Sequence, residues 1–268
     1  MGKSSTHEAL ELDAPAFYRR TLHILADEQV AFLVGGSHAF LHYTGIVRDT
    51  KDLDIFVRRS DVDRALEALR EAGYLTEITF PHWLAKAMHG EDFIDIVFSS
   101  GNGVAAIDDA CFEHAVEAQV LNMPVKLMPV EELLWQKSFI MERERYDGAD
   151  IAHLLRSCAD ILDWDRLLER FAPHWQLLFS HLLMFAFIYP SERHRIPPTV
   201  VRGLCDRLSA EMDAPPSEDR VCQGTLISRS QFLIDIGRYG YADARLRPRG
   251  NMSAEETVYW TWAIENVR

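Results

Sequence analysis

Two short segments of the sequence alternate acidic and aliphatic residues, and this alternation constrains the fold more than any other feature. In the segment KDLDIFV, Asp52 and Asp54 alternate with Leu53, Ile55 and Val57. Successive side chains of a β-strand point to opposite faces. The segment therefore predicts a strand whose aliphatic face enters a core while two carboxylates lie side by side on the other face.

The segment DFIDIVF, residues 92–98, repeats the pattern with Asp95 in the middle of an otherwise apolar strand. Burying a carboxylate without a partner is costly, so Asp95 requires a metal ion or a proton. If the two strands are neighbours, Asp95 joins Asp52 and Asp54 in one cluster. Clustered carboxylates repel one another unless a cation lies between them or one is protonated, and Mg²⁺ prefers such oxygen ligands.

A glycine turn precedes the first of these segments. The strand VAFLV, residues 30–34, ends at Gly35, Gly36 and Ser37, and a short helix with Ser37 near its N-cap follows. Glycines let the backbone approach a phosphate closely, and a helix N-terminus presents free N–H groups to it. Alone, the turn fits any tight turn and the two aspartates fit any exposed strand; together they favour a metal–phosphate site.

The order of the expected elements indicates an α+β fold. Strands and helices are mixed up to residue 129, which predicts a mixed sheet with flanking helices over 1–129. Residues 130–268 show mainly helical periodicity, including helices expected over 130–146 and 228–241, and 213–219 reads as a loop. We therefore expect a sheet domain followed by a helical domain.

Composition narrows the classes of partner. The formal net charge of -13 argues against a broad grip on nucleic acid, which needs a basic surface, and favours a small-molecule ligand. The four cysteines lack metal or disulfide spacing, which favours reduced thiols in the cytoplasm. The apolar run 177–188 is too short to span a bilayer and predicts a buried core helix rather than a membrane protein.

The strand, glycine turn, helix, Asp-x-Asp strand and later Asp strand together resemble the nucleotidyltransferase superfamily, the polymerase-beta-like fold. The match runs through Gly35, Gly36, Ser37 and the three aspartates. The spacing from Ser37 to Asp52 is similar to that of the branch that contains small-molecule and toxin-type nucleotidyltransferases. The resemblance covers roughly the first half of the chain.

The resemblance implies a Mg²⁺-dependent enzyme that transfers a nucleoside monophosphate from a nucleoside triphosphate such as ATP to an acceptor hydroxyl and releases pyrophosphate. Asp52 and Asp54 would bind the ion, and Asp95 would hold a second ion or act as a base. Arg48, on the approach to the aspartates, and Lys137, in the helical region, would contact the nucleotide. Two metal ions can balance charge on the attacking and leaving oxygens.

Several alternatives stay open from sequence. The runner-up is a non-catalytic binding module of the same fold, such as a toxin–antitoxin component. Trp83 and His82 could line an acceptor pocket, although half-buried packing is the default. The arginines of 245–249 could bind RNA or phosphate, although a solvated loop is favoured. The apolar helices 175–189 and 258–267 could form a homodimer interface as readily as a core.

Overall fold

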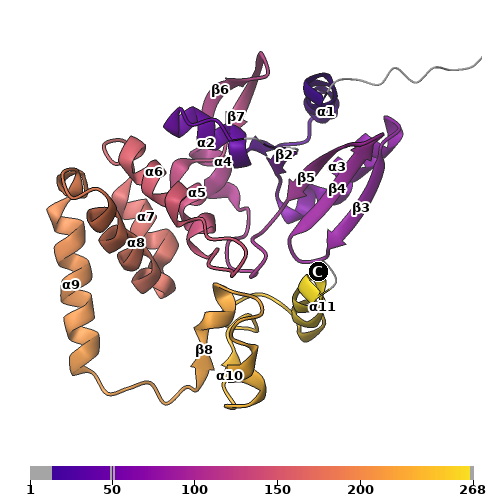
Figure 1. The fold of residues 1–268 in the computed structure, drawn as a ribbon. Helices are drawn as coiled ribbons and strands as arrows, with labels where there is room; N and C mark the ends of the chain where they lie inside the picture. Colours follow the sequence, from indigo (N-terminus) through magenta and orange to yellow (C-terminus); the bar gives the residue numbers. More distant parts are fainter. Residues whose placement is uncertain (1–13, 49, 51, 266–268) are drawn as a thin grey trace, which may run out of the picture.

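The protein folds around one mixed sheet of seven strands in the order β3-β4-β5-β2-β1-β7-β6 (Figure 1). The structure is a computed structural model that describes residues 14–48, 50 and 52–265. The strands are β1 (Leu33–Val34), β2 (Leu53–Phe56), β3 (Leu75–Phe80), β4 (Leu84–His89), β5 (Asp92–Val97), β6 (Val116–Val120) and β7 (Met123–Leu127). β2 is parallel to β5 and antiparallel to β1, and β4 is antiparallel to β5.

The helices surround this sheet and make up most of the chain after residue 129. The first half contains α1 (Ala14–Asp27), α2 (Gly36–Thr44), α3 (Val62–Glu71) and α4 (Asp109–Glu113). The second half contains α5 (Val130–Ser138), α6 (Gly148–Cys158), α7 (Trp164–Phe171), α8 (Trp175–Ile188), α9 (Pro198–Asp213), α10 (Leu233–Gly237) and α11 (Ala254–Glu265), with the short strands β8 (Val221–Cys222) and β9 (Ala242–Asp243). The α+β class with a mainly helical C-terminal region is confirmed.

The alternation of side chains in β2 and β5 gives the sheet two chemically different faces. Leu53, Ile55, Ile94 and Ile96 are fully buried in a core that also contains apolar residues of α1 and α3. Each such side chain contributes roughly 1.5–3 kcal/mol by leaving water. The opposite face carries the aspartates and is directed toward the helical region. The back of the sheet therefore fixes the strands that present the carboxylates.

Two helices expected from the sequence are shorter than predicted. The prediction of a helix over 130–146 was wrong after Ser138, where α5 ends. The prediction of a helix over 228–241 was wrong outside α10. The reason is a contact between the two segments: the Met141 N–H donates to the Ile227 carbonyl oxygen at 3.0 Å. The Glu142 carboxylate also accepts hydrogen bonds from the Ser228 hydroxyl and the Arg229 N–H. These long-range bonds replace the local helical ones.

The last part of the chain, residues 221–265, returns to the sheet, and we call it the C-terminal segment. Trp260 of α11 packs against Phe80 of β3 and Trp83, with ring centroids 4.9 and 5.3 Å apart. Figure 1 shows α11, in yellow, at the end of β3, while α9 stands away on the other side of the molecule. The division into domains at residue 129 stays a prediction, and this segment contacts structure on both sides of it.

One arginine of the predicted solvated loop is buried. Arg245 is 1% exposed, and its guanidinium pairs with the Asp243 carboxylate at 2.6 Å. It also donates to the Thr261 hydroxyl at 2.8 Å and to the Arg229 carbonyl oxygen. The solvated-loop prediction was therefore wrong for Arg245, which ties β9 to α11, whereas Arg247 is exposed.

The apolar run around α8 lies in a longer helical stretch than the sequence suggested. Residues 164–188 form one stretch long and apolar enough to cross a membrane by length and composition. Core helices meet the same criteria, so this is weak support for a membrane span. Trp175, Leu178 and Phe185 of α8 are buried against the protein core.

Replacing Arg245 by methionine should destabilise the protein by roughly 3–5 kcal/mol, because the buried Asp243 carboxylate loses its partner. The free energy of unfolding from urea titration measures this loss. Arg247→Met is the matched control in the same loop and should change stability by less than about 0.5 kcal/mol, because Arg247 is exposed. Equal effects of the two substitutions would contradict the structural role assigned to Arg245.

Candidate active site

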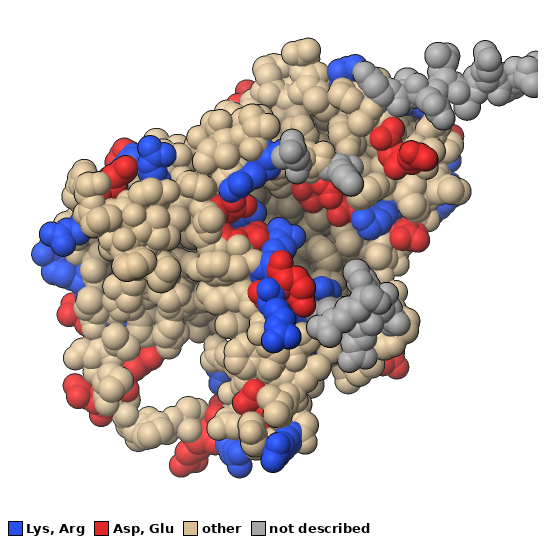
Figure 2. All heavy atoms as spheres, in the orientation of Figure 1, with Lys and Arg blue, Asp and Glu red and all other residues tan. Residues whose placement is uncertain are grey.

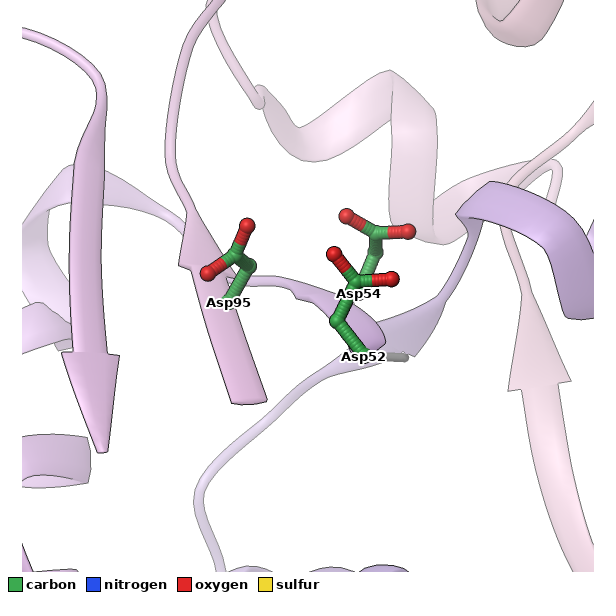
Figure 3. A group of neighbouring side chains, drawn as sticks. All are labelled: Asp52, Asp54 and Asp95. Carbon is green, nitrogen blue, oxygen red and sulfur yellow. The ribbon is translucent and has the colours of Figure 1, made fainter. Parts of the chain in front are cut away.

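Three carboxylates meet on the sheet face that points toward the helical region (Figure 3). Asp54 of β2 and Asp95 of β5 are direct cross-strand partners in the parallel register, and Asp52 comes immediately before β2. One ligand atom from each residue lies within 4.8 Å of the others. The structure thus brings together the three aspartates that the alternating segments suggested.

The electrostatics of the cluster show uncompensated negative charge. Desolvation, reinforced by the charges of Asp52 and Asp95, raises the pKa of Asp54 to about 7. Asp54 keeps some exposed surface into the site, but its carboxylate has lost most of its hydration to the surrounding protein. Burial also raises the pKa of Asp95 above its ordinary value, and a hydrogen bond from Lys86 opposes this rise in part. Close carboxylate oxygens in such surroundings are ligands that suit a divalent cation.

The glycine turn is shaped by the side chains that it meets. Gly36 has a φ of +51°, and a Cβ there would overlap the Asp54 carboxylate. A Cβ at Gly35 would overlap the Phe56 ring, and the Gly35 N–H donates to the Asp54 carbonyl oxygen. α2 begins at Gly36 with Gly35 as its N-cap, so the expectation of Ser37 near the N-cap was wrong by two positions. Two glycines are needed because the helix start lies directly against β2.

The cluster opens into a cavity of about 820 Å³, which is within the roughly 300–1,000 Å³ typical of ligand sites. Figure 2 shows the hollow on this face, with acidic and basic side chains along its rim. Every site residue predicted from sequence lines this cavity except Gly35, which lies behind Gly36 in the turn. The three aspartates and the start of α2 form one wall.

A network of three cations and two carboxylates lies at the cavity beside Phe40 of α2. The Lys137 ammonium lies 2.9 Å from both the Asp147 and the Asp150 carboxylates. Arg145 donates two hydrogen bonds to Asp147, and Arg48 pairs with Asp150 at 2.7 Å. Lys137 lies in the last turn of α5 rather than in the middle of a longer helix. The network carries one net positive charge, and each of its three cations is paired with Asp147 or Asp150.

Further lining residues come from parts of the chain that the sequence did not connect with the site. The C-terminal segment contributes Arg229 and Trp260, and the loop after α5 contributes Glu142. Trp83 lines the cavity too, whereas its neighbour His82 bonds the Gly101 carbonyl oxygen. Arg229 lies over the Trp260 ring at 4.3 Å. Trp83 was a candidate from the sequence and lines the cavity, whereas Glu142, Arg229 and Trp260 lie far from the aspartates in sequence and in no recognisable motif, so only the fold could identify them.

The glycine turn at a helix start and the carboxylate cluster on adjacent strands form the arrangement expected from the resemblance noted in the sequence. A sequence profile of a family described as uncharacterised nucleotidyltransferases matches residues 29–189. That match covers more than half of the chain, and the chain belongs to this family. No protein among those with curated functions matches it.

Similar solved structures include two antibiotic-modifying proteins. The antibiotic-resistance factor ANT(2'')-Ia is 14% identical, with 62% of this chain and 95% of that chain covered and a TM-score of 0.45. The lincosamide antibiotic adenylyltransferase LnuA is 18% identical, with 53% and 96% covered and a TM-score of 0.39. The protein JHP933 from Helicobacter pylori is 10% identical, with 75% and 96% covered and a TM-score of 0.36. At these values, the acceptors of those proteins say nothing about the acceptor of this chain.

Replacing Gly36 by alanine should displace the Asp54 carboxylate and weaken Mn²⁺ binding about 10- to 100-fold, as loss of support around a metal ligand does. Gly45→Ala is the matched control, because Gly45 also has a positive φ but a Cβ there meets no atom within 4 Å. Both variants should lose roughly 1–2 kcal/mol of stability from backbone strain. Titration with Mn²⁺ monitored by electron paramagnetic resonance measures the affinity, and equal affinities in the two variants would contradict the clash.

In metal-free protein, Asp54→Asn should raise the free energy of unfolding at pH 8 by roughly 2–4 kcal/mol. The folded pKa of Asp54 is about 7 against an ordinary value of 3.8, so its stabilising protonation is present below pH 3.8 and is lost as pH rises through 7. The gain of the variant over the wild type should therefore shrink between pH 8 and pH 5. Urea titrations with a chelator at both pH values measure it.

The difference in free energy of unfolding between variant and wild type at each pH isolates the contribution of Asp54. Burial lowers the pKa of His38 and His82, which adds stability as pH rises and opposes the Asp54 effect in the same window. Those contributions are common to both proteins and cancel in the difference. A variant that is equally or less stable at pH 8 would show that the Asp54 charge is already compensated in the folded protein.

Proposed function

We propose that this nucleotidyltransferase is Mg²⁺-dependent and transfers a nucleoside monophosphate from a nucleoside triphosphate to a hydroxyl group of a small molecule, releasing pyrophosphate. The observation that carries the proposal is that one cavity is lined by both a carboxylate cluster and a group of cations. The cluster presents the carboxylates of Asp52, Asp54 and Asp95, and the cations include the ammonium of Lys137 and the guanidinium of Arg145. A metal-bound triphosphate is a ligand whose charges match both groups.

The carboxylate cluster suits the ion. Asp52 and Asp54 would hold Mg²⁺, and the Thr50 hydroxyl, which donates to the Asp52 carboxylate, would orient one of these ligands. When bound, the ion supplies positive charge to the phosphate oxygens of the nucleotide. Gly36 allows Asp54 to stand against the start of α2, so the ion and the N–H groups of that helix would act on the same phosphates.

The group of cations suits the leaving group. Lys137, Arg145 and Arg48 carry three positive charges next to the cavity, and the paired aspartates hold them without neutralising them fully. In-line transfer of a phosphoryl group spreads charge onto the departing oxygens. Cations fixed before the reaction stabilise that charge without reorganisation. We assign binding of the pyrophosphate portion to this network.

Asp95 is suited to accept the proton of the acceptor. Its carboxylate lines the cavity beside the other two aspartates, and its strand position is fixed by the buried Ile94 and Ile96. In the proposed step, the acceptor O–H bond gives its proton to Asp95 while the oxygen forms a bond to the α-phosphorus. The bond from that phosphorus to the bridging oxygen breaks, and pyrophosphate leaves with the electron pair.

The C-terminal segment and the loop after α5 would bind the acceptor. The described lining residues of the cavity include six carboxylates and four cations, which give it a formal net charge of -2. A bound nucleoside triphosphate makes the cavity more negative still. This charge favours a neutral or cationic small molecule over a nucleic acid. The buried Cys111 and Cys158 are free thiols, which is consistent with a cytoplasmic enzyme.

The test is pyrophosphate release from labelled nucleoside triphosphates with a panel of hydroxylated small molecules, combined with thermal shift. Nucleotide with Mg²⁺ at about 100 times its Kd should stabilise the wild type by about 2.7 kcal/mol. Asp54→Asn should abolish this stabilisation. Asp95→Asn should retain it but slow transfer by roughly 10²- to 10⁴-fold, the usual contribution of a general base.

Asp92→Asn is the matched control, because Asp92 lies on the same strand but on the opposite face from Asp95. It should leave nucleotide binding and transfer unchanged. The proposal fails if no nucleoside triphosphate stabilises the wild type in the presence of Mg²⁺. If Asp95→Asn transfers the nucleotide as fast as Asp92→Asn does, Asp95 is not the base of the reaction.

A further inference from the structure

A row of four charged residues crosses the sheet at the level of the carboxylate cluster. The strand registers place Glu77 of β3 opposite Lys86 of β4, Lys86 opposite Asp95 of β5, and Asp95 opposite Asp54 of β2. Cross-strand partners share a face of the sheet. Lys86 is thus the cation of this row and lies directly beside the third carboxylate of the site.

The contact between Lys86 and Asp95 is close and partly shielded. The Lys86 ammonium is 2.6 Å from an Asp95 carboxylate oxygen, and the two side chains are 25% and 16% exposed. The same ammonium lies 4.3 Å from the centre of the Phe93 ring, which adds an attraction of cation and aromatic face. Glu77, on the outer side, is exposed. Lys86 is therefore held toward Asp95 by two groups of β5.

Lys86 reaches Asp95 from the side of β4 and not through the cavity. Asp95 is among the described lining residues of the cavity, but Lys86 is not. A nucleotide or acceptor can enter without displacing the ammonium. The pair is consequently a fixed part of the site during binding.

We propose that Lys86 takes the place of a second divalent ion. This inference rests on the proposed function and refines it: the site binds one ion, on Asp52 and Asp54, and the Lys86 ammonium supplies the positive charge at Asp95. A second dication at Asp95 would lie against a positive charge already bonded to the same carboxylate. Asp95 keeps its other oxygen for the acceptor hydroxyl, and Lys86 acts as the residue that positions it.

The experiment counts bound ions in the full-length protein without nucleotide, using Mn²⁺ and electron paramagnetic resonance. The wild type should bind one Mn²⁺ per chain. Lys86→Met should bind two Mn²⁺ ions per chain. If the wild type binds a second ion weakly, the affinity of Lys86→Met for that ion should be at least about tenfold higher. The double variant Lys86→Met with Asp95→Asn should return to one ion, because the second ion needs the freed carboxylate.

Two controls separate charge from damage to the fold. Lys86→Arg keeps the positive charge and should bind one ion. Lys126→Met removes an exposed lysine of β7, away from the cluster, and should also bind one. If Lys86→Met does not fold, Asp95→Asn alone decides the question: the affinity for the single ion should stay within about threefold of the wild type, because Asp95 is not its ligand.

The outcomes distinguish this inference from the proposed function. Two tight ions in the wild type, or a large loss of affinity in Asp95→Asn, would overturn the role of Lys86 while leaving a metal-dependent transferase intact. An unchanged count of one in folded Lys86→Met would overturn it as well. A wild type that binds no Mn²⁺, with or without nucleotide, would overturn the metal site of the proposed function itself.

Discussion

The repulsion among three carboxylates within 4.8 Å of one another is the constraint on which the rest of the site depends. The fold does not relieve it by exposing them to water, since desolvation raises the pKa of Asp54 to about 7. Instead it places cations near the cluster: Lys86 on the sheet beside Asp95, and Lys137 and Arg145 among the residues that line the cavity. The negative charge of Asp52 and Asp54 is left without such a partner, and the divalent ion of the proposed function would balance it.

Holding such charges close requires a rigid scaffold, and the back of the sheet supplies it. The aliphatic residues that alternate with the aspartates are fully buried beneath α1 and α3. A shift of one residue in register would put Leu53 and Ile55 into the cavity and the carboxylates into the core, which is prohibitively costly. Packing therefore enforces the register that pairs Asp54 with Asp95. Stability and site geometry come from the two faces of the same strands.

The sequence predicted the elements that depend on local periodicity, but not the features that depend on contacts between distant segments. Alternation predicted the strands that carry Asp54 and Asp95, because a period of two is intrinsic to an extended chain. The helical spacing of 130–146 was equally regular, yet the helix stops at Ser138 because residues after it bond the C-terminal segment. The lining role of Trp260 was invisible for the same reason.

The two halves of the cavity also differ in how they relate to the family. The family match spans residues 29–189, which include the aspartates, the glycine turn and the basic network. Arg229 and Trp260 lie beyond it, and both line the cavity through a segment held in place by the buried Arg245. A nucleotide half shared with relatives and an acceptor half built outside the shared region would let one reaction serve different acceptors. The C-terminal segment is therefore where the acceptor of this chain should be sought.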